Sequence, residues 1–123
     1  MPFTTQPALQ ATTRQLAQVR PANTNNTDAY SPADGVTTEV ETIIVCNHTG
    51  ASINYRIFHD EDGTTYTQAT ALYFDVPLAA NTTAEITFPI YMNDPAGFIG
   101  VRSSTGDGLT FTLYGKEIQV RAR

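Results

Sequence analysis

The sequence is poor in positive charge, contains one cysteine and has no tryptophan. Lysine occurs once, at Lys116, and the formal net charge is −5, so nucleic acid is not an expected partner, because phosphate backbones are bound by basic surfaces. The single cysteine, Cys46, cannot form a disulfide within the chain, which indicates synthesis in a reducing compartment. Without tryptophan or a cysteine pair, an immunoglobulin domain of the disulfide type is excluded.

Long apolar runs are also missing. The longest are a few residues, well below the roughly 20 that span a membrane. The N-terminus lacks a basic stretch leading into an apolar segment, so no secretion signal is expected. The sequence therefore predicts a chain that has no membrane partner.

The residues that are abundant indicate a small β-protein. The chain has 123 residues, of which 41% are apolar and 15% charged. Threonine alone occupies 20 positions, and β-branched residues fit half-buried strands better than long solvated helices. This length provides one hydrophobic core and one domain.

The first 28 residues differ in composition from the rest and predict an extended N-terminal arm and linker, followed by a β-sandwich domain over residues 29–123. Pro2, Pro7 and Pro21 interrupt this segment. A short helix over residues 8–19 and a disordered tail are the alternatives to an extended docking arm. Apolar and arginine side chains are spaced along it, as a docking arm requires. The predicted partner-binding residues are Phe3, Leu9, Arg14, Leu16, Val19 and Arg20.

From Val36 onward, short alternating segments separated by turn signals predict six or seven antiparallel strands. The first strand places its even-numbered residues from Val36 to Cys46 on one face. Turn residues at 48–50 predict a hairpin with residues 53–57, and those at 103–108 predict another between residues 98–101 and 109–113.

Two prolines predict edge strands. Pro77 and Pro89 lie within strand-like segments, and a residue without an N–H is tolerated at the edge of a sheet. No pattern of helical crossovers accompanies these strands. We therefore predict an all-β fold, a single antiparallel β-sandwich or jelly-roll-like barrel with an extended N-terminal arm.

No residues form a recognisable catalytic signature, and we expect no enzyme, no metal and no cofactor. Asp60 and Asp62 precede Gly63 and offer oxygens to a calcium ion, but the remaining ligands of a calcium loop are missing, which favours an acidic turn. Cys46 and His48 stand two residues apart, as a zinc or nucleophile pair would, but further ligands are lacking and a buried thiol beside a turn is favoured.

Six tyrosines offer another kind of site. Aromatic faces stack on sugar rings, and Tyr66, in the polar loop 60–70, is the best candidate for exposure. Most tyrosines of a small β-sandwich pack at the periphery of its hydrophobic core, and this is the favoured interpretation. A glycan-binding site is the alternative.

The sequence resembles small β-sandwich structural proteins of tailed bacteriophages, which are head decoration or cement subunits and tail-associated accessory proteins. The likeness extends over about residues 15–118 and consists of strand and turn patterns. It rests on segments 16–21 with Tyr30, 41–47, 55–58, 72–81 and 109–118.

This resemblance implies a location in the virion and oligomerisation. The function we expect is that of a non-enzymatic capsid decoration protein, a homotrimer that binds the major capsid protein and stabilises the assembled head. The alternative is a tail-tip or fibre-associated module that recognises a glycan through exposed tyrosines and the loop 60–70.

Overall fold

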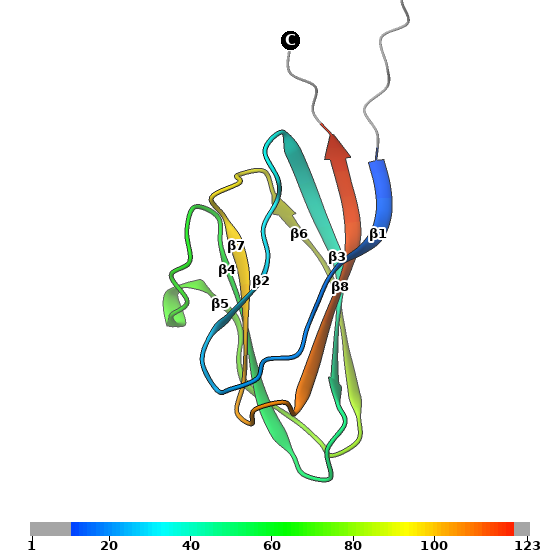
Figure 1. Ribbon diagram of the computed structural model, residues 1–123, viewed down its shortest axis with the longest axis vertical. Helices are drawn as coiled ribbons and strands as arrows, with labels where there is room; N and C mark the ends of the chain where they lie inside the picture. The colour runs from blue at the N-terminus through cyan, green and yellow to red at the C-terminus, as the bar shows by residue number, and fades with distance from the viewer. Residues whose placement is uncertain (1–10, 120–123) are drawn as a thin grey trace, which may run out of the picture.

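The computed structural model describes residues 11–119, which form two antiparallel sheets packed face to face (Figure 1). Each sheet contains four strands. The elements are β1 (Ala11–Val19), β2 (Thr27–Tyr30), β3 (Val36–Asn47), β4 (Ile53–Asp60), the 3-10 turn η1 (Gln68–Thr70), β5 (Ala71–Leu78), β6 (Thr83–Met92), β7 (Phe98–Ser103) and β8 (Leu109–Gln119).

The strand order is that of a jelly roll. One sheet, sheet A, has the order β1-β8-β3-β6, and the other, sheet B, has the order β2-β7-β4-β5. Of the strands consecutive in sequence, β4 and β5 pair with each other, and the other connections in the described chain cross between the sheets. Two such four-stranded sheets with crossing connections define the jelly roll. The predicted all-β sandwich or jelly-roll-like barrel is confirmed, and the six strands from Val36 onward match the predicted number.

Both predicted hairpins are wrong. β3 lies in sheet A and β4 in sheet B, and the same holds for β8 and β7. The turn after β3 is organised by Asn47, whose buried side-chain amide donates to the carbonyl oxygens of Ala51 at 2.8 Å and Leu78 at 3.0 Å. These bonds hold the chain where it passes from one sheet to the other, so the same turn residues serve a crossover instead of a hairpin.

The N-terminal segment enters the sandwich earlier than predicted. Residues 11–19 form strand β1 instead of a helix and pair along β8, from Ala11 with Ile118 to Val19 with Phe111. Thr27–Tyr30 form β2, which pairs with β7. The strands therefore begin at Ala11, not after residue 28, because Leu16, Ala17 and Val19 pack against the core and stabilise an extended strand.

The core lies between the sheets, and a β-bulge in β3 sets which residues reach it. Pairing with β8 shifts between Val40 and Thr42, so the core-facing positions change from Thr38 and Val40 to Ile43 and Val45. The predicted alternation is thus correct only as far as Val40. The fully buried side chains of largest volume are Phe58, Phe111, Ile43, Ile53, Ile57, Met92, Ile99, Leu109, Leu113, Val40, Val45 and Val101.

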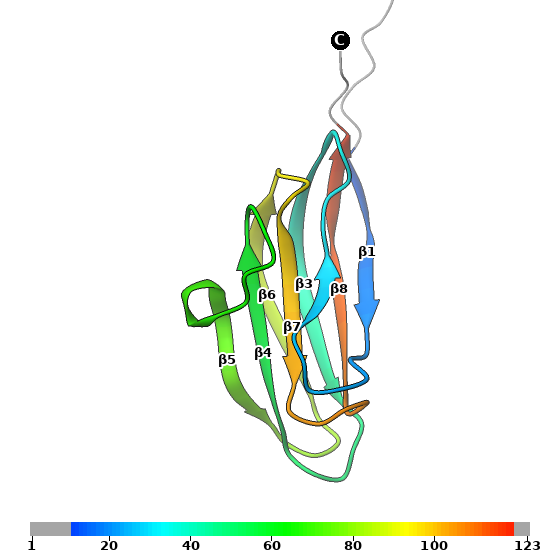
Figure 2. The ribbon, with the colours of Figure 1, turned by 60° about the vertical axis from the view of Figure 1, so that its left-hand side comes forward.

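Four strands form the edges of the sheets: β1 and β6 in sheet A, and β2 and β5 in sheet B (Figure 2). Pro77 lies in β5 and Pro89 in β6, which confirms both predicted edge strands. β5 is further distorted at Asp75, whose backbone adopts a left-handed φ of 52°. Proline and local distortion are the usual means by which proteins block an exposed edge.

Candidate functional site

Strand β1 is the edge best suited to pairing with another chain. It has nine residues and no proline, and its pairing with β8 shifts once, between Gln15 and Ala17. By contrast, β5 and β6 contain prolines and β2 has four residues. One side of β1 pairs with β8, and no other described strand pairs with its free side. Unpaired N–H and C=O groups along such an edge can accept an added strand. We therefore take the β1 edge as the candidate functional site.

Four of the predicted partner-binding residues lie on or next to β1. Leu16 and Val19 are half-buried and pack against the core. Arg14 forms an ion pair with Glu117, with Nη1 and Oε1 3.1 Å apart, and Arg20 lies 3.9 Å from a carboxylate oxygen of Asp107. The other two, Phe3 and Leu9, lie outside the described residues. Their contact with a partner stays a prediction.

A hydrogen-bonded cluster fastens β1 and β2 to the sandwich. The hydroxyl of Tyr30, on β2, donates to Oε2 of Glu117 at 2.6 Å and lies 2.7 Å from the hydroxyl oxygen of Thr38, which is fully buried. Arg14 on β1 binds the other oxygen of Glu117. Burial, followed by the hydrogen bond to Glu117, raises the pKa of Tyr30 to about 12. Sequence analysis missed this cluster because Tyr30 and Glu117 lie 87 residues apart.

Tyr66, the candidate for sugar stacking, packs against its own domain. Its ring stacks on Phe58 with centroids 5.5 Å apart, and its hydroxyl donates to a carboxylate oxygen of Asp28 at 2.6 Å. Gly100 lies directly below the ring, because a Cβ added there would be 2.5 Å from Cζ of Tyr66. Burial and the neighbouring Asp28 carboxylate raise the pKa of the Tyr66 hydroxyl above its usual range. To stack on a sugar through the same face, this ring would have to leave Phe58.

Other tyrosines are more accessible. Tyr91 on β6 is 65% exposed and Tyr114 on β8 is 43% exposed. Both strands belong to sheet A, whereas the loop 60–70 lies beside sheet B. The structure therefore does not bring the exposed tyrosines together with the loop in which we expected a glycan site.

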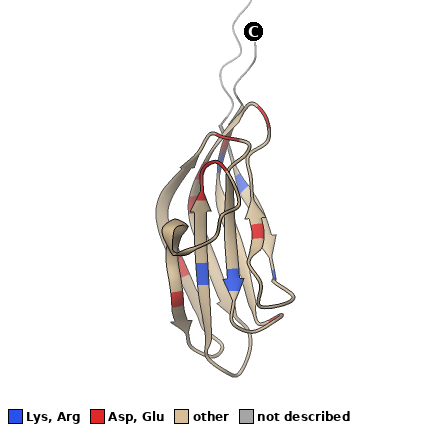
Figure 3. Ribbon diagram, turned by 90° about the vertical axis from the view of Figure 1, so that its left-hand side faces the viewer, with Lys and Arg blue, Asp and Glu red and all other residues tan. Residues whose placement is uncertain are grey.

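Acidic side chains gather at the loops of one end of the molecule, which Figure 3 shows in red at the upper end of sheet B. Asp60 shapes the first of these loops by accepting backbone hydrogen bonds from Asp62 at 3.3 Å and Thr65 at 3.0 Å, which lower its pKa. The hydrogen bond and the negative charge of Asp60 raise the pKa of Asp62. Within residues 11–119, no group of three or more His, Cys, Asp or Glu side chains is arranged to hold a metal ion.

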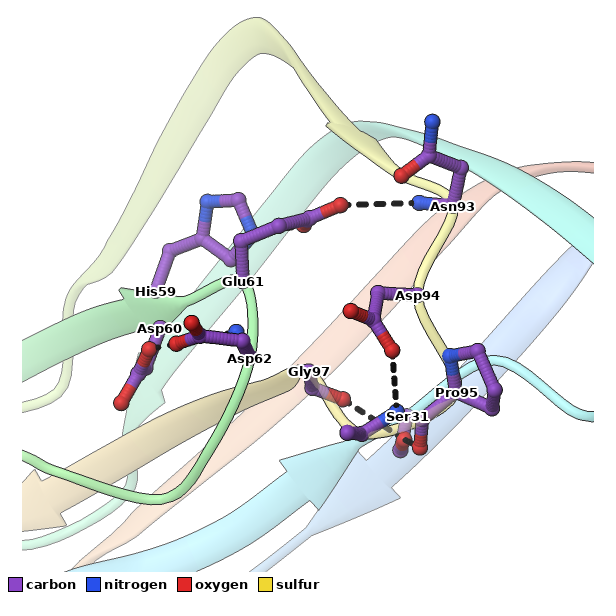
Figure 4. Close-up of polar contacts among 10 residues, drawn as sticks. Ser31, His59, Asp60, Glu61, Asp62, Asn93, Asp94, Pro95 and Gly97 are labelled. Atoms are coloured by element: carbon purple, nitrogen blue, oxygen red, sulfur yellow. Dashed lines mark hydrogen bonds and ion pairs between the residues drawn. The ribbon is translucent and has the colours of Figure 1, made fainter.

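The loop that follows β4 also contacts the loop between β6 and β7 (Figure 4). Glu61 lies 3.1 Å from Nε2 of His59 and accepts a hydrogen bond from the backbone N–H of Asn93 at 3.2 Å. Asp94, in the loop between β6 and β7, accepts a hydrogen bond from the backbone N–H of Ala96 at 2.8 Å. These carboxylates thus determine the conformation of both loops.

Cys46 and His48 do not form a joint site in the structure. Cys46 is half-buried in β3, and His48 is exposed beyond the last residue of that strand. Asn47, between them, is directed to the crossover described above. Among the described residues, no hydrogen bond joins the cysteine to the histidine.

A shallow depression lies on the outer side of sheet A, next to the bulge. Its volume is about 250 Å³, and it is lined by Glu39, Glu41, Thr87, Phe88 and Pro89. Phe88 stacks on Tyr73 of β5 with ring centroids 6.1 Å apart, which closes the side of the sandwich between the β5 and β6 edges. Lys116 pairs with Glu41 at 3.3 Å beside this depression.

The described residues contain no helix of the length and apolar character that a membrane crossing requires. The described secondary structure is strands and one short 3-10 turn.

No protein-family model matches this sequence, and no curated protein matches it. Among solved structures, a chain from the Bacillus endospore appendages, reported as a novel family of disulfide-linked pili, superimposes with a TM-score of 0.57 at 9% identity and covers 98% of each chain. A chain from the Gx strain of infectious bursal disease virus gives a TM-score of 0.51 at 14% identity over 93% of this chain. This protein spans 33% of that viral chain. The chain is therefore similar to both proteins in its fold.

Proposed function

We propose that this chain is a non-enzymatic structural protein that acts by associating with other subunits of a larger assembly. The observation that carries this proposal is the edge strand β1, which has nine residues, no proline and one side that pairs with no other strand of residues 11–119. The comparisons add support, since a pilus and a virus are both assemblies of protein subunits.

The specific role we propose is that of a capsid decoration protein of a tailed bacteriophage. This choice rests on the sequence resemblance described above. As a trimer on the major capsid protein, the chain would bury surface across the joints between capsid subunits. Because it would bind the assembled lattice and not its dissociated parts, its binding would stabilise the assembled form by mass action.

The contacts would be made by the β1 edge and by the residues that precede it. An added strand makes main-chain hydrogen bonds, which need little side-chain specificity. Arg14, exposed near the middle of β1, and Arg20, exposed just after its last residue, would contribute charged contacts. Phe3 and Leu9 would contribute apolar ones.

Deletion of residues 1–10 tests this role. We expect the shortened protein to lose occupancy on phage heads, measured by co-sedimentation, because Phe3 and Leu9 are removed while every described strand is kept. An unchanged urea unfolding midpoint serves as the control for folding. Full occupancy of the shortened protein on heads would contradict the proposed role of the arm.

A second candidate is a filament subunit, which is favoured by the match over 98% of both chains with the endospore appendage protein. Disulfides alone cannot link such a filament, because one cysteine per chain joins two copies at most. Electron microscopy of the concentrated protein distinguishes the candidates. A decoration protein forms no filaments alone, and a filament subunit forms them in the Cys46→Ser variant as well.

A further inference from the structure

Arg102 is the basic side chain that lacks a carboxylate partner within the described part of the chain. The other lysine and arginine side chains of residues 11–119 each form an ion pair. The pairs are Arg14 with Glu117, Arg20 with Asp107, Arg56 with Asp75 and Lys116 with Glu41. The Nε of Arg102 donates to the backbone carbonyl of Thr24 at 2.6 Å. This bond holds the guanidinium in place, and an arginine held in this way is suited to bind a carboxylate through its remaining N–H groups.

The position of Arg102 makes an anionic partner more favourable still. It lies on the outer side of sheet B, directly opposite Arg56 in the pairing of β4 with β7, and like charges in this arrangement destabilise a sheet. Arg56 is neutralised by Asp75, with hydrogen bonds of 2.6 Å and 3.0 Å, and its guanidinium lies 3.8 Å from the centre of the Phe74 ring. The pair therefore retains one uncompensated positive charge.

The same sheet has the opposite charge at one end. β4 ends at Asp60, and Glu61, Asp62 and Asp94 lie in the two loops there (Figures 3 and 4). None of these four carboxylates pairs with a lysine or arginine among residues 11–119. Arg56 and Asp60 are four residues apart along β4, which corresponds to roughly 13 Å at about 3.3 Å per residue. Tyr66, stacked on Phe58 and Gly100, lies between the two charged regions.

We propose that the outer face of sheet B binds a second copy of this chain, with Arg102 of each copy against the acidic loops of the other. The two copies are related by a two-fold axis near Tyr66, so that the strands of the facing sheets run in opposite directions and both charge contacts form at once. An axis through the arginines themselves would oppose four guanidinium groups. A two-fold contact of this kind closes as a dimer.

The composition of the face fits an interface with apolar residues at and beside its centre and charges at its margins. Near the axis lie the half-buried ring of Tyr66 and the chain segment that carries it. Leu72 and Phe74, at 41% and 36% exposure, are apolar side chains that face solvent on the neighbouring β5. Tyrosine, phenylalanine and arginine are enriched at protein interfaces. β1 belongs to the other sheet, so this dimer does not depend on the function proposed above.

Sedimentation velocity of the full chain tests the proposal. We expect a dimer at low salt that dissociates as NaCl rises to about 0.5 M, because screening then acts within a few Å. Arg102→Glu and Asp62→Arg are each expected to weaken the dimer at least about tenfold, since each change removes two symmetry-related contacts. The double variant restores one charge pair in each contact and is expected to dimerise more tightly than Arg102→Glu alone, although Asp60, Glu61 and Asp94 keep their negative charges.

Lys116→Glu is the matched control for Arg102→Glu. It makes the same change of net charge as that variant, but on sheet A, and leaves the proposed face of sheet B intact. Circular dichroism verifies that each variant is folded, and the salt dependence of the unaltered protein tests the proposal even if one variant does not fold. A monomer at every concentration, or a dimer insensitive to salt and to Arg102→Glu, would overturn it. So would a double variant that dimerises no more tightly than Arg102→Glu alone. Binding of an acidic polysaccharide that is abolished by Arg102→Glu would then identify the site as one for sugar acids.

Discussion

Gly100 shows how a single missing side chain shapes one face of the molecule. The ring of Tyr66 lies where a Cβ of residue 100 would be, with three ring carbons within 2.7 Å of that position. We expect Gly100→Ala to displace the ring and to lower the free energy of unfolding by about 1–3 kcal/mol, as overpacking does. Urea unfolding measures the change. Gly50→Ala is the control, since a Cβ at Gly50 meets nothing within 4 Å, and an equal effect of both substitutions would contradict the close packing of Tyr66.

Tyr30 links stability to alkaline pH. Its pKa of about 12 in the folded protein exceeds the value of about 10 expected in the unfolded chain. As pH rises from about 10 to 12, the unfolded chain loses the proton first, so the contribution of the neutral hydroxyl is full below pH 10 and declines above it.

The Tyr30→Phe variant isolates this effect. At neutral pH it should be less stable by about 1–3 kcal/mol, because Thr38 and Glu117 lose a hydrogen-bond partner. Urea unfolding of both proteins should show this difference narrowing between about pH 10 and 12. Because the two proteins share all other tyrosines, the titration of those tyrosines cancels in the comparison. A difference in the free energy of unfolding that is constant with pH would contradict the raised pKa of Tyr30.

At the scale of elements, β1 and β2 are edge strands of different sheets, and both contribute side chains to the core between the sheets. β1 pairs with β8, and β2 pairs with β7. Leu16 and Val19 on β1 and Tyr30 on β2 pack against the core. Full burial of a large apolar side chain stabilises a fold by about 1.5–3 kcal/mol, and the half-buried Leu16 and Val19 contribute less than this each. Together with Tyr30 they still contribute a sizeable share of the roughly 5–15 kcal/mol of a whole domain.

Two truncations test this role. We expect deletion of residues 1–28 to abolish cooperative unfolding, whereas deletion of residues 1–10, which keeps both strands, should leave the unfolding midpoint within the scatter of repeated measurements. Circular dichroism during urea titration distinguishes the two. A cooperative transition in the longer deletion would show that β1 and the first two residues of β2, Thr27 and Asp28, are dispensable. Partner binding could then be tested on residues 29–123 alone.

The strands and their partners differ in how well they could be predicted from sequence. Alternation identified the strands from Val36 onward, and Pro77 and Pro89 identified two edges, because these are local signals. Partners were not predictable, since pairs such as Ala11 and Ile118 are distant in sequence. β1 was expected as arm or helix because its apolar residues are few, and it becomes a strand through its pairing with β8.

The candidate site was predictable to a similar degree. Arg14 and Arg20 are predicted from composition to contact a partner, and both are exposed, Arg14 on β1 and Arg20 just after it. Their contact with a partner stays a prediction. The bonds from Tyr30 to Glu117 and from Tyr66 to Asp28 join distant segments, so the burial of Tyr66 could not be inferred from the polar loop around it. Contacts of this kind follow from the jelly-roll topology and not from any local pattern.

At the scale of the whole molecule, the described residues form a two-sheet sandwich with one long edge strand, β1, whose outer side pairs with no other described strand. Among the four edge strands, β2 has four residues, and β5 and β6 contain prolines, whereas β1 has nine residues and no proline. A domain built in this way is suited to join a larger assembly through main-chain contacts.

The central claim is tested most directly by immunogold electron microscopy of the phage particles in which we propose that this protein lies, with an antibody raised against residues 36–123. We predict label spread evenly over the head, as a decoration protein at repeated capsid sites requires. Label confined to the tail, or unlabelled particles on which the epitope is accessible, would contradict the account.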